Sequence, residues 1–213
     1  MKAINVKPFA SLAFVNRYAL RKPMTTVLRS SGARLLAAAI LALPLATRAN
    51  GAPFVMDHAE SHVDIAVKST LYSFVARLEE FDVAITLDPE NGRVESTVFH
   101  ADLSALKTGI TDRDHNMSVW LQAKEFPQVV FELGSVDRGP NGALTAHGRF
   151  QLHGQLHDIR FPMTVSLSRG LTTIDGTVTL DTQDFGLPII RYWVLTVDPV
   201  LQVHFHLQGS LAP

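Results

Sequence analysis

Hydrophobic and polar residues alternate along most of the chain from residue 53 to the C-terminus. Side chains in a β-strand repeat every two residues, so this alternation predicts strands with one apolar and one polar face. Half-buried strands of this kind are typical of an antiparallel sheet. The alternating runs are 61–67, 81–87, 129–133, 144–152, 161–167, 174–180 and 201–207.

Turn-forming sequences separate these runs. Longer examples are Asp88–Gly92 and Arg138–Gly142, and shorter ones are His153-Gly154 and Arg169-Gly170. The number of strands is about eight if residues 71–87 form one long bent strand or two short ones. Short strands at hairpin spacing indicate a sandwich or a barrel, and about eight of them can close into an antiparallel barrel without free edges. The chain is therefore predicted to be all-β.

One segment has helical rather than strand periodicity. Thr111 and Asp114 have the spacing of a capping box, with Thr111 as N-cap. Met117, Trp120 and Leu121 then share one face of a short helix, which Pro127 is expected to end. We predict that this helix lies over one end of the barrel.

The alternation leaves open what the barrel encloses. An eight-stranded barrel has an interior that side chains just fill, or one that holds a single small ligand. The pattern alone favours a packed interior, because interiors are normally close-packed and alternation shows only which face is apolar.

The first 52 residues have the features of an export signal with a long lead. Leu35–Leu45 is an uncharged run of 11 residues, too short for a membrane-spanning helix and preceded by Arg29 and Arg34. Small residues follow, so cleavage is expected near Ala49 or Ala52, and Met24 is an alternative start. The prediction is a signal peptide at 1–52 and one barrel domain at 53–213, soluble and not membrane-spanning, in the periplasm or secreted.

The charge is divided unevenly between these two parts. Residues 1–52 contain 8 of the 19 basic residues and no acidic one, so the remainder has 11 basic against 20 acidic residues, a formal charge of −9. An acidic domain repels nucleic acid, so no nucleic-acid partner is expected. The chain has no cysteine, which excludes disulfides, thiol catalysis and thiolate metal sites.

Two groups of polar residues are candidates for chemistry. His204 and His206 project from the same face of a predicted strand and could provide two metal ligands, but a solvated outer face is the stronger interpretation because no third ligand is fixed. Arg113, between Asp112 and Asp114, could bind an anionic head group at the barrel mouth. The alternative for Arg113 is an ion pair at a helix N-terminus.

Nothing in the sequence indicates catalysis. Asp184-Phe185-Gly186 matches the magnesium motif of kinases, but no glycine-rich nucleotide loop or catalytic loop accompanies it. A nucleophile elbow of the form Gly-x-Ser-x-Gly is also absent. We predict that the protein is not an enzyme and uses no cofactor other than a bound lipid or isoprenoid.

Five motifs, in this order and spacing, resemble the YceI-like family from about Phe54 to Leu211. They are Asp102-Leu-Ser-Ala-Leu-Lys-Thr-Gly109, Arg113-Asp114, Phe126-Pro-Gln-Val-Val-Phe131, Gly148-Arg-Phe-Gln-Leu-His-Gly154 and Asp184-Phe-Gly186. This chain differs from the family pattern mainly around the helix and loops. Asn116-Met117 replaces a common His-Leu pair, Thr182 replaces a common Arg, and Lys68-Ser69 and Ala76 replace residues of the first hairpin.

The resemblance implies an eight-stranded, lipocalin-like antiparallel barrel with the short helix over one end. It also implies a non-catalytic periplasmic protein that holds a polyisoprenoid or another long apolar chain, as carrier or sequestering protein. The alternatives are a metal-binding module using His204 and His206, or a solid-core barrel that acts through a protein partner. The expected ligand-binding residues are Phe74, Phe81, Val83, Phe131, Phe150, Phe161, Met163, Val178 and Phe205, with Met117 and Trp120 as a lid.

Overall fold

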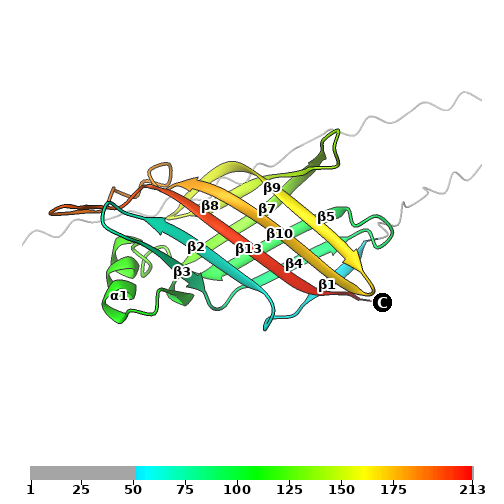
Figure 1. The fold of residues 1–213 in the computed structure, drawn as a ribbon, viewed down its shortest axis with the longest axis horizontal. Coiled ribbons are helices and arrows are strands. Elements are labelled where there is room, and N and C mark those ends of the chain that lie inside the picture. Colours follow the sequence, from blue (N-terminus) through cyan, green and yellow to red (C-terminus); the bar gives the residue numbers. More distant parts are fainter. Residues whose placement is uncertain (1–50, 213) are drawn as a thin grey trace, which may run out of the picture. The chain divides into compact units, whose positions relative to one another are not determined.

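The computed structural model describes residues 51–212, which form a sheet of long strands and one α-helix (Figure 1). Except for its last two residues, the predicted signal segment lies outside the described residues. Within the described part of the chain, no helix is long and apolar enough to cross a membrane. The helical elements are η1 (Leu103–Ala105, 3₁₀) and α1 (Thr111–Trp120). The strands are β1 (Ala52–Met56), β2 (His62–Lys68), β3 (Ser73–Leu78), β4 (Asp82–Leu87), β5 (Val94–Asp102), β6 (Leu106–Lys107), β7 (Gln128–Arg138), β8 (Leu144–Leu152), β9 (Gln155–Ser168), β10 (Leu171–Asp181), β11 (Arg191–Tyr192), β12 (Leu195–Thr196) and β13 (Val200–Leu211).

Several of the shorter strands are halves of longer, bent strands. β1 and β2 lie one after the other along the same edge of β13, where they pair with Gly209–Leu211 and Gln202–His206 respectively. β3 and β4 pair with β2 and β1 in the same way, and β5 and β6 pair with β4 and β3. Residues 73–87 therefore form the single bent strand that the sequence predicted as one of two alternatives.

Counted in this way, eight antiparallel strands close into a barrel. Each bent or straight strand pairs with the next one along the chain, and β13 closes the barrel against β1 and β2. The predicted fold class, including the short helix, is confirmed. Closure leaves no free edge in the barrel wall, so the backbone hydrogen-bonding groups of each strand are paired within the sheet.

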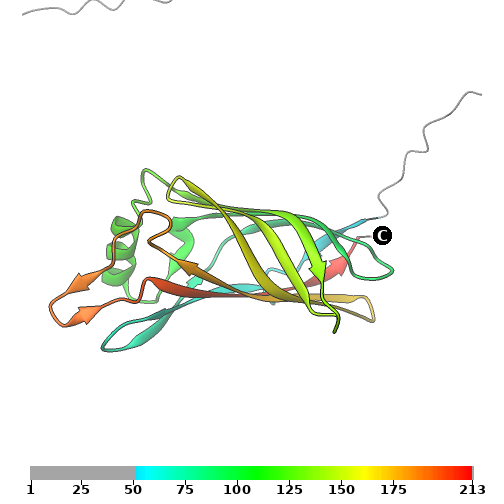
Figure 2. The same ribbon diagram turned by 90° about the horizontal axis from the view of Figure 1, so that it is seen from above.

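The connections are distributed between two ends of the barrel. Helix α1, the turn between β2 and β3 and the small β11–β12 hairpin lie together at one end, which we call the helix end (Figures 1 and 2). The C-terminus and the β9–β10 turn lie at the opposite end (Figure 1). Any site at the helix end is therefore built from loops and α1 rather than from the strand wall.

The predicted two-residue turns are present. His153 and Gly154 connect β8 to β9 with φ angles of 51° and 71°, and Arg169 and Gly170 connect β9 to β10 with 51° and 84°. Two successive positive φ angles define a type I′ turn, whose twist matches that of the flanking strands. These turns fix the register of the longest hairpins and thereby decide which residues face inward.

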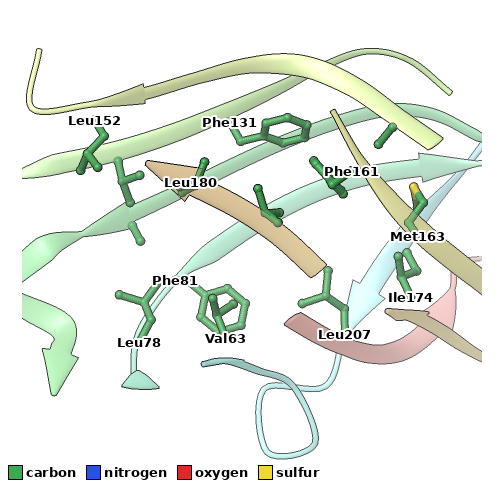
Figure 3. Close-up of a cluster of buried hydrophobic side chains, with 14 of the residues drawn as sticks. Val63, Leu78, Phe81, Phe131, Leu152, Phe161, Met163, Ile174, Leu180 and Leu207 are labelled. Atoms are coloured by element: carbon green, nitrogen blue, oxygen red, sulfur yellow. The ribbon is translucent and has the colours of Figure 1, made fainter. Parts of the chain in front are cut away.

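The apolar face of each strand points into the barrel. Figure 3 shows inward side chains from strands on different sides of the wall, including Val63, Phe131, Phe161 and Leu207. These four residues are all buried. The alternation in the sequence therefore correctly identifies the inner face.

Aromatic rings and glycines alternate across five neighbouring strands of the inner wall. Phe131, Phe161 and Phe205 lie on β7, β9 and β13, and Gly148 and Gly176 lie on the intervening strands β8 and β10. The ring centroids are 5.4 Å apart for Phe131 and Phe161, and 5.8 Å apart for Phe161 and Phe205. A Cβ atom at Gly148 would collide with the Phe131 ring, and one at Gly176 with the Phe205 ring. The glycines thus let the rings lie over the strand backbone and contact one another.

We predict that Gly148→Ala destabilises the barrel by about 1–3 kcal/mol, the usual cost of overpacking. The added methyl group would collide with both the Phe131 ring and the carbonyl oxygen of Glu132, and the latter is backbone that cannot rotate away. The midpoint of urea unfolding measures the effect. Gly134→Ala in β7 is the matched control, because its Cβ would lie 3.4 Å from the nearest atom, an ordinary contact. Equal destabilisation by the two substitutions would contradict the prediction.

Candidate ligand-binding cavity

The interior of the barrel is a cavity of about 1010 Å³. This volume lies at the upper end of the range for ligand sites, roughly 300–1,000 Å³. The packed interior favoured by the alternation alone is therefore wrong. Alternation fixes the face of a side chain but not the distance to the opposite wall, and here rings held against the wall leave the centre of the barrel open.

Ten of the eleven apolar residues expected to bind the ligand line this cavity. Phe81 is the exception: it is buried, but it packs against Phe99, with ring centroids 5.7 Å apart, instead of lining the cavity. The reason is its position at the entry to β4, where the bent strand changes direction. The lining residues are Phe74, Val83, Met117, Trp120, Phe131, Phe150, Phe161, Met163, Val178 and Phe205.

The sequence analysis missed two sections of the wall: strand β5, with the lining residues Val94, Thr97 and Phe99, and the connection between β10 and β13. The connection between β10 and β13 contributes Pro188, Ile189, Ile190 and Val197 to the cavity lining. This connection lacks the alternation of a strand and the spacing of a helix, so periodicity could not assign it. The run Leu187–Ile190 was the available signal, since consecutive apolar residues outside a strand need a buried surface to contact.

The charged residues of the cavity are gathered at the helix end. All four of them come from α1 or from the β10–β13 connection: Asp112, Arg113, Arg191 and Asp198. Asn116 and Thr182, two positions where the chain differs from the family pattern, also line the cavity. The deeper wall is predominantly apolar, so the cavity combines an apolar interior with a polar mouth.

Arg113 lies at this mouth, and some of its N–H groups have no hydrogen-bond partner among the described residues. One terminal nitrogen, Nη2, donates to the carbonyl oxygen of Thr108 at 3.0 Å, and the guanidinium carbon lies 4.1 Å from the centre of the Phe74 ring. Its Nε is buried without a hydrogen-bond partner, and within residues 51–212 no carboxylate lies close enough to form an ion pair with it. Arg113 therefore does not form the ion pair of the alternative interpretation, although Asp112 and Asp114 lie in the first turn of α1 as that interpretation expected.

The start of α1 differs from the predicted capping box. Ile110, not Thr111, is the N-cap, and no side chain caps the helix there. Asp114 instead accepts hydrogen bonds from the hydroxyl and the backbone N–H of Thr108, and the hydroxyl bond is the main reason that its pKa lies below the ordinary value. Asp114 thereby anchors the preceding loop and fixes the helix that presents Arg113.

The end of α1 also differs from the prediction. The helix ends at Trp120, well before Pro127, and Gln122 adopts a positive φ of 50° just after it. The indole N–H of Trp120 donates to the carbonyl oxygen of Pro188 at 2.8 Å. This bond connects α1 to the β10–β13 connection, so the two elements form one cover over the mouth.

His204 and His206 lie on the outer face of β13. The sequence analysis favoured this outer position over a metal site. His206 contacts Asp175 at 2.6 Å and lies beside His62, with ring centroids 5.4 Å apart, while His204 contacts Thr177 at 3.0 Å. Among residues 51–212, no group of three or more possible ligands is arranged to hold a metal.

On the same outer face, Arg77 of β3 pairs with Asp64 of β2 at 2.7 Å. The hydrogen bond from Arg77 holds the pKa of Asp64 below its ordinary value. The pair links neighbouring strands at the surface of the barrel, away from the cavity lining.

Asp184-Phe185-Gly186 has a structural role. Phe185 is buried, with its ring centroid 5.6 Å from that of Phe150 and in an edge-to-face arrangement. Its carbonyl oxygen lies 2.9 Å from Nδ1 of His153, at the β8–β9 turn. The motif thus closes the wall beside β8 and does not face an open site.

Comparison with solved structures identifies the same architecture at low sequence identity. The crystal structure of Burkholderia cenocepacia BcnA is 20% identical, with a TM-score of 0.66 over 73% of this chain and 100% of its own. A polyisoprenoid binding domain from Saccharophagus degradans, implicated in plant cell wall breakdown, is 14% identical, with a TM-score of 0.56 over 76% of this chain and 99% of its own. These similarities establish the fold.

A third similar structure is the Campylobacter jejuni YCEI protein, which is 13% identical and has a TM-score of 0.55 over 65% of this chain and 85% of its own. No match is found among curated proteins. The family model of the YceI-like domain matches residues 54–209, nearly all of the barrel. Together with the closed barrel and its internal cavity, this match shows that the chain belongs to the YceI-like family.

Proposed function

We propose that the protein binds a polyisoprenoid or a similar long apolar chain in the barrel, as a carrier or a sequestering protein. The observation that carries this proposal is the cavity of about 1010 Å³ with an apolar wall and a polar mouth. A hydrocarbon chain gains roughly 0.8 kcal/mol for each CH₂ removed from water, so a five-carbon isoprenoid unit gains several kcal/mol before ordering costs.

The chemistry of the wall favours such a ligand over water. The cavity volume corresponds to roughly thirty water molecules in the liquid. A buried water needs two to four polar partners, and the deep wall supplies mainly Phe, Val, Leu, Ile and Met side chains. The wall therefore offers water few hydrogen-bond partners, which supports an apolar chain as the occupant.

The comparisons support the same class of ligand. The similar domain from Saccharophagus degradans is named for polyisoprenoid binding, and we propose a ligand of that chemical class here. We assign no catalytic step to the chain. His153 and the turn around Phe185 are engaged in a hydrogen bond within the wall, and the charged residues lie at the mouth, where they suit a head group.

We further propose that the protein acts in the periplasm after removal of the signal peptide. Strand β1 begins at Ala52 and pairs with Leu87 and Thr86 of β4 through Ala52 and Pro53. Cleavage after Ala49 leaves this strand complete, whereas cleavage after Ala52 removes its first residue. Cleavage after Ala49 is therefore favoured.

The first prediction concerns the ligand itself. Organic extraction of protein purified from its native host should release a long-chain lipid detectable by mass spectrometry. Val203→Trp should reduce the released amount severalfold, because Val203 lines the cavity and an indole there fills part of it. Ligand-free extracts from the unaltered protein would contradict the proposal.

Gln202→Trp is the matched control for this experiment. Gln202 precedes Val203 in β13 and faces outward, so the same substitution there leaves the cavity unchanged. Thermal unfolding of both variants establishes that any loss of lipid comes from the cavity and not from unfolding. Equal lipid loss in the two variants would argue against binding in the barrel.

A second prediction concerns the head group. Arg113→Gln should weaken binding of a polyprenyl monophosphate by about 1.5–3 kcal/mol, roughly tenfold to a hundredfold, because it removes a charge-assisted hydrogen bond. Binding of the corresponding uncharged polyprenol should change much less. Titration with both compounds makes the comparison, and an equal loss for the two would exclude Arg113 as a head-group ligand.

A third prediction concerns processing. The chain recovered from the periplasmic fraction of an exporting bacterium should begin at Asn50, as determined by intact-mass measurement and N-terminal sequencing. A chain recovered only from the cytoplasm with its N-terminus unprocessed would contradict the proposed location.

A further inference from the structure

Five large apolar residues are exposed on two loops at the helix end of the barrel. We call them the rim patch: Leu71 and Tyr72 in the β2–β3 turn, and Tyr192, Trp193 and Val194 in the β11–β12 hairpin. Trp193 is 92% exposed, and Tyr192 and Val194 are 69% and 73% exposed. In Figures 1 and 2 the hairpin extends beyond the barrel wall at this end. Large apolar residues gathered on a projecting tip indicate a surface that contacts something other than water.

The two loops that carry the rim patch are joined into one unit. The Thr70 hydroxyl donates to the carbonyl oxygen of Val194 at 2.8 Å, and the Thr70 backbone N–H donates to that of Thr196 at 2.9 Å. The N–H of Asp198 donates to the carbonyl oxygen of Lys68 at 2.8 Å. These bonds hold Leu71 and Tyr72 close to the hairpin, so the patch is presented as a preformed surface.

The rim patch is continuous with the cavity. Tyr72 and Tyr192 belong to the patch and also line the cavity. Ile190 and Leu195, which lie on either side of the hairpin's patch residues in the chain, are further lining residues. An apolar path thus leads from the exposed tip into the barrel.

The two loops of the rim patch contain basic residues and no acidic one, in contrast to the acidic domain that carries them. The two loops, residues 68–72 and 190–196, contain Lys68 and Arg191 and no acidic residue, and Asp198, which follows the hairpin, lines the cavity. The chain beyond residue 52 carries a formal charge of −9. A basic, apolar tip on an acidic domain matches the surface of a bilayer that contains anionic lipid, where Trp, Tyr and basic residues are favoured.

We propose that the rim patch docks the protein on an anionic lipid bilayer, with Trp193 inserted into the interfacial region. This proposal rests on the proposed function, because docking places the mouth where an apolar chain can pass between bilayer and barrel without crossing water. A second copy of the chain fits the patch less well. A twofold contact through this tip would bring Arg191 of the two copies together.

The test is co-sedimentation of the protein with vesicles of zwitterionic phospholipid containing one-fifth anionic phosphatidylglycerol. The protein is expressed from the full-length sequence, so every variant carries the same N-terminus. Trp193→Ser should lower the vesicle partition coefficient about tenfold or more, because the indole is the largest apolar group of the patch. Leu171→Ser is the matched control: Leu171 is also exposed, at 45%, but it is the first residue of β10, directly after the β9–β10 turn at the opposite end.

Two further measurements separate insertion from simple charge attraction. The tryptophan fluorescence of the unaltered protein should shift to shorter wavelength on addition of vesicles, and Trp193→Ser, which keeps only Trp120, should lose this shift. Arg191→Glu should weaken partitioning to anionic vesicles about fivefold or more, at about 1 kcal/mol per basic residue near the surface. Equal partitioning of the unaltered protein, Trp193→Ser and Leu171→Ser would overturn the proposal, as would unchanged tryptophan emission of the unaltered protein.

The proposed function is tested separately in the same set of proteins. Trp193→Ser should bind a polyprenol dispersed in detergent as tightly as the unaltered protein, but extract it from vesicles several times more slowly. Polyprenol binding without vesicle binding would overturn the docking and leave the proposed function intact. Vesicle binding without polyprenol binding would overturn the proposed function and leave the docking intact. Concentration-dependent dimerisation that Trp193→Ser abolishes, without vesicle binding, would assign the patch to a second copy instead.

Discussion

Closure of the sheet is the constraint on which the rest of the structure depends. Once β13 pairs with both β1 and β2, the strands of the barrel have no free edge, and the inner face has no second layer to pack against. Its apolar side chains can then reach only one another or a guest molecule. In this chain the inner side chains do not fill the space, and a cavity of about 1010 Å³ results.

Whether such a barrel is solid or open depends on how its aromatic side chains lie. Gly148 and Gly176 provide room for the rings of Phe131 and Phe205 against the strand backbone. Phe161 lies between these two rings and contacts both, so the three form a continuous band on the wall. Side chains that lie along the wall cover backbone and leave the centre free, which is what the binding of a flexible apolar chain requires.

The helix end supplies the charged groups that the apolar barrel wall lacks. Helix α1 is fixed at its start by Asp114 and Thr108, and at its end by the bond from Trp120 to Pro188. Between these anchors Arg113 faces the mouth, close to loops whose exposed apolar tip continues into the cavity. In the proposed function and docking, the apolar wall provides affinity, while the mouth selects the head group and contacts the bilayer.

The sequence by itself determined most of the strands, their inner faces and several turns, because a period of two residues and Gly-containing turns are local properties, but it did not predict β5 (Val94–Asp102). Together with the resemblance to the YceI-like family, it predicted the closed eight-stranded barrel and ten of the eleven proposed lining residues. It could not determine the cavity, which depends on ring orientations set by glycines on neighbouring strands. The placement of Phe81 depends on the bend between β3 and β4, and Asp114 accepts hydrogen bonds from Thr108 instead of completing a capping box at Thr111. Residues 187–190 line a cavity formed mainly by strands that are distant in the sequence. The two loops of the rim patch are more than 100 residues apart and are joined by bonds such as that from Thr70 to Val194. Only the tertiary structure could place these segments, because no local pattern relates residues so far apart in the chain.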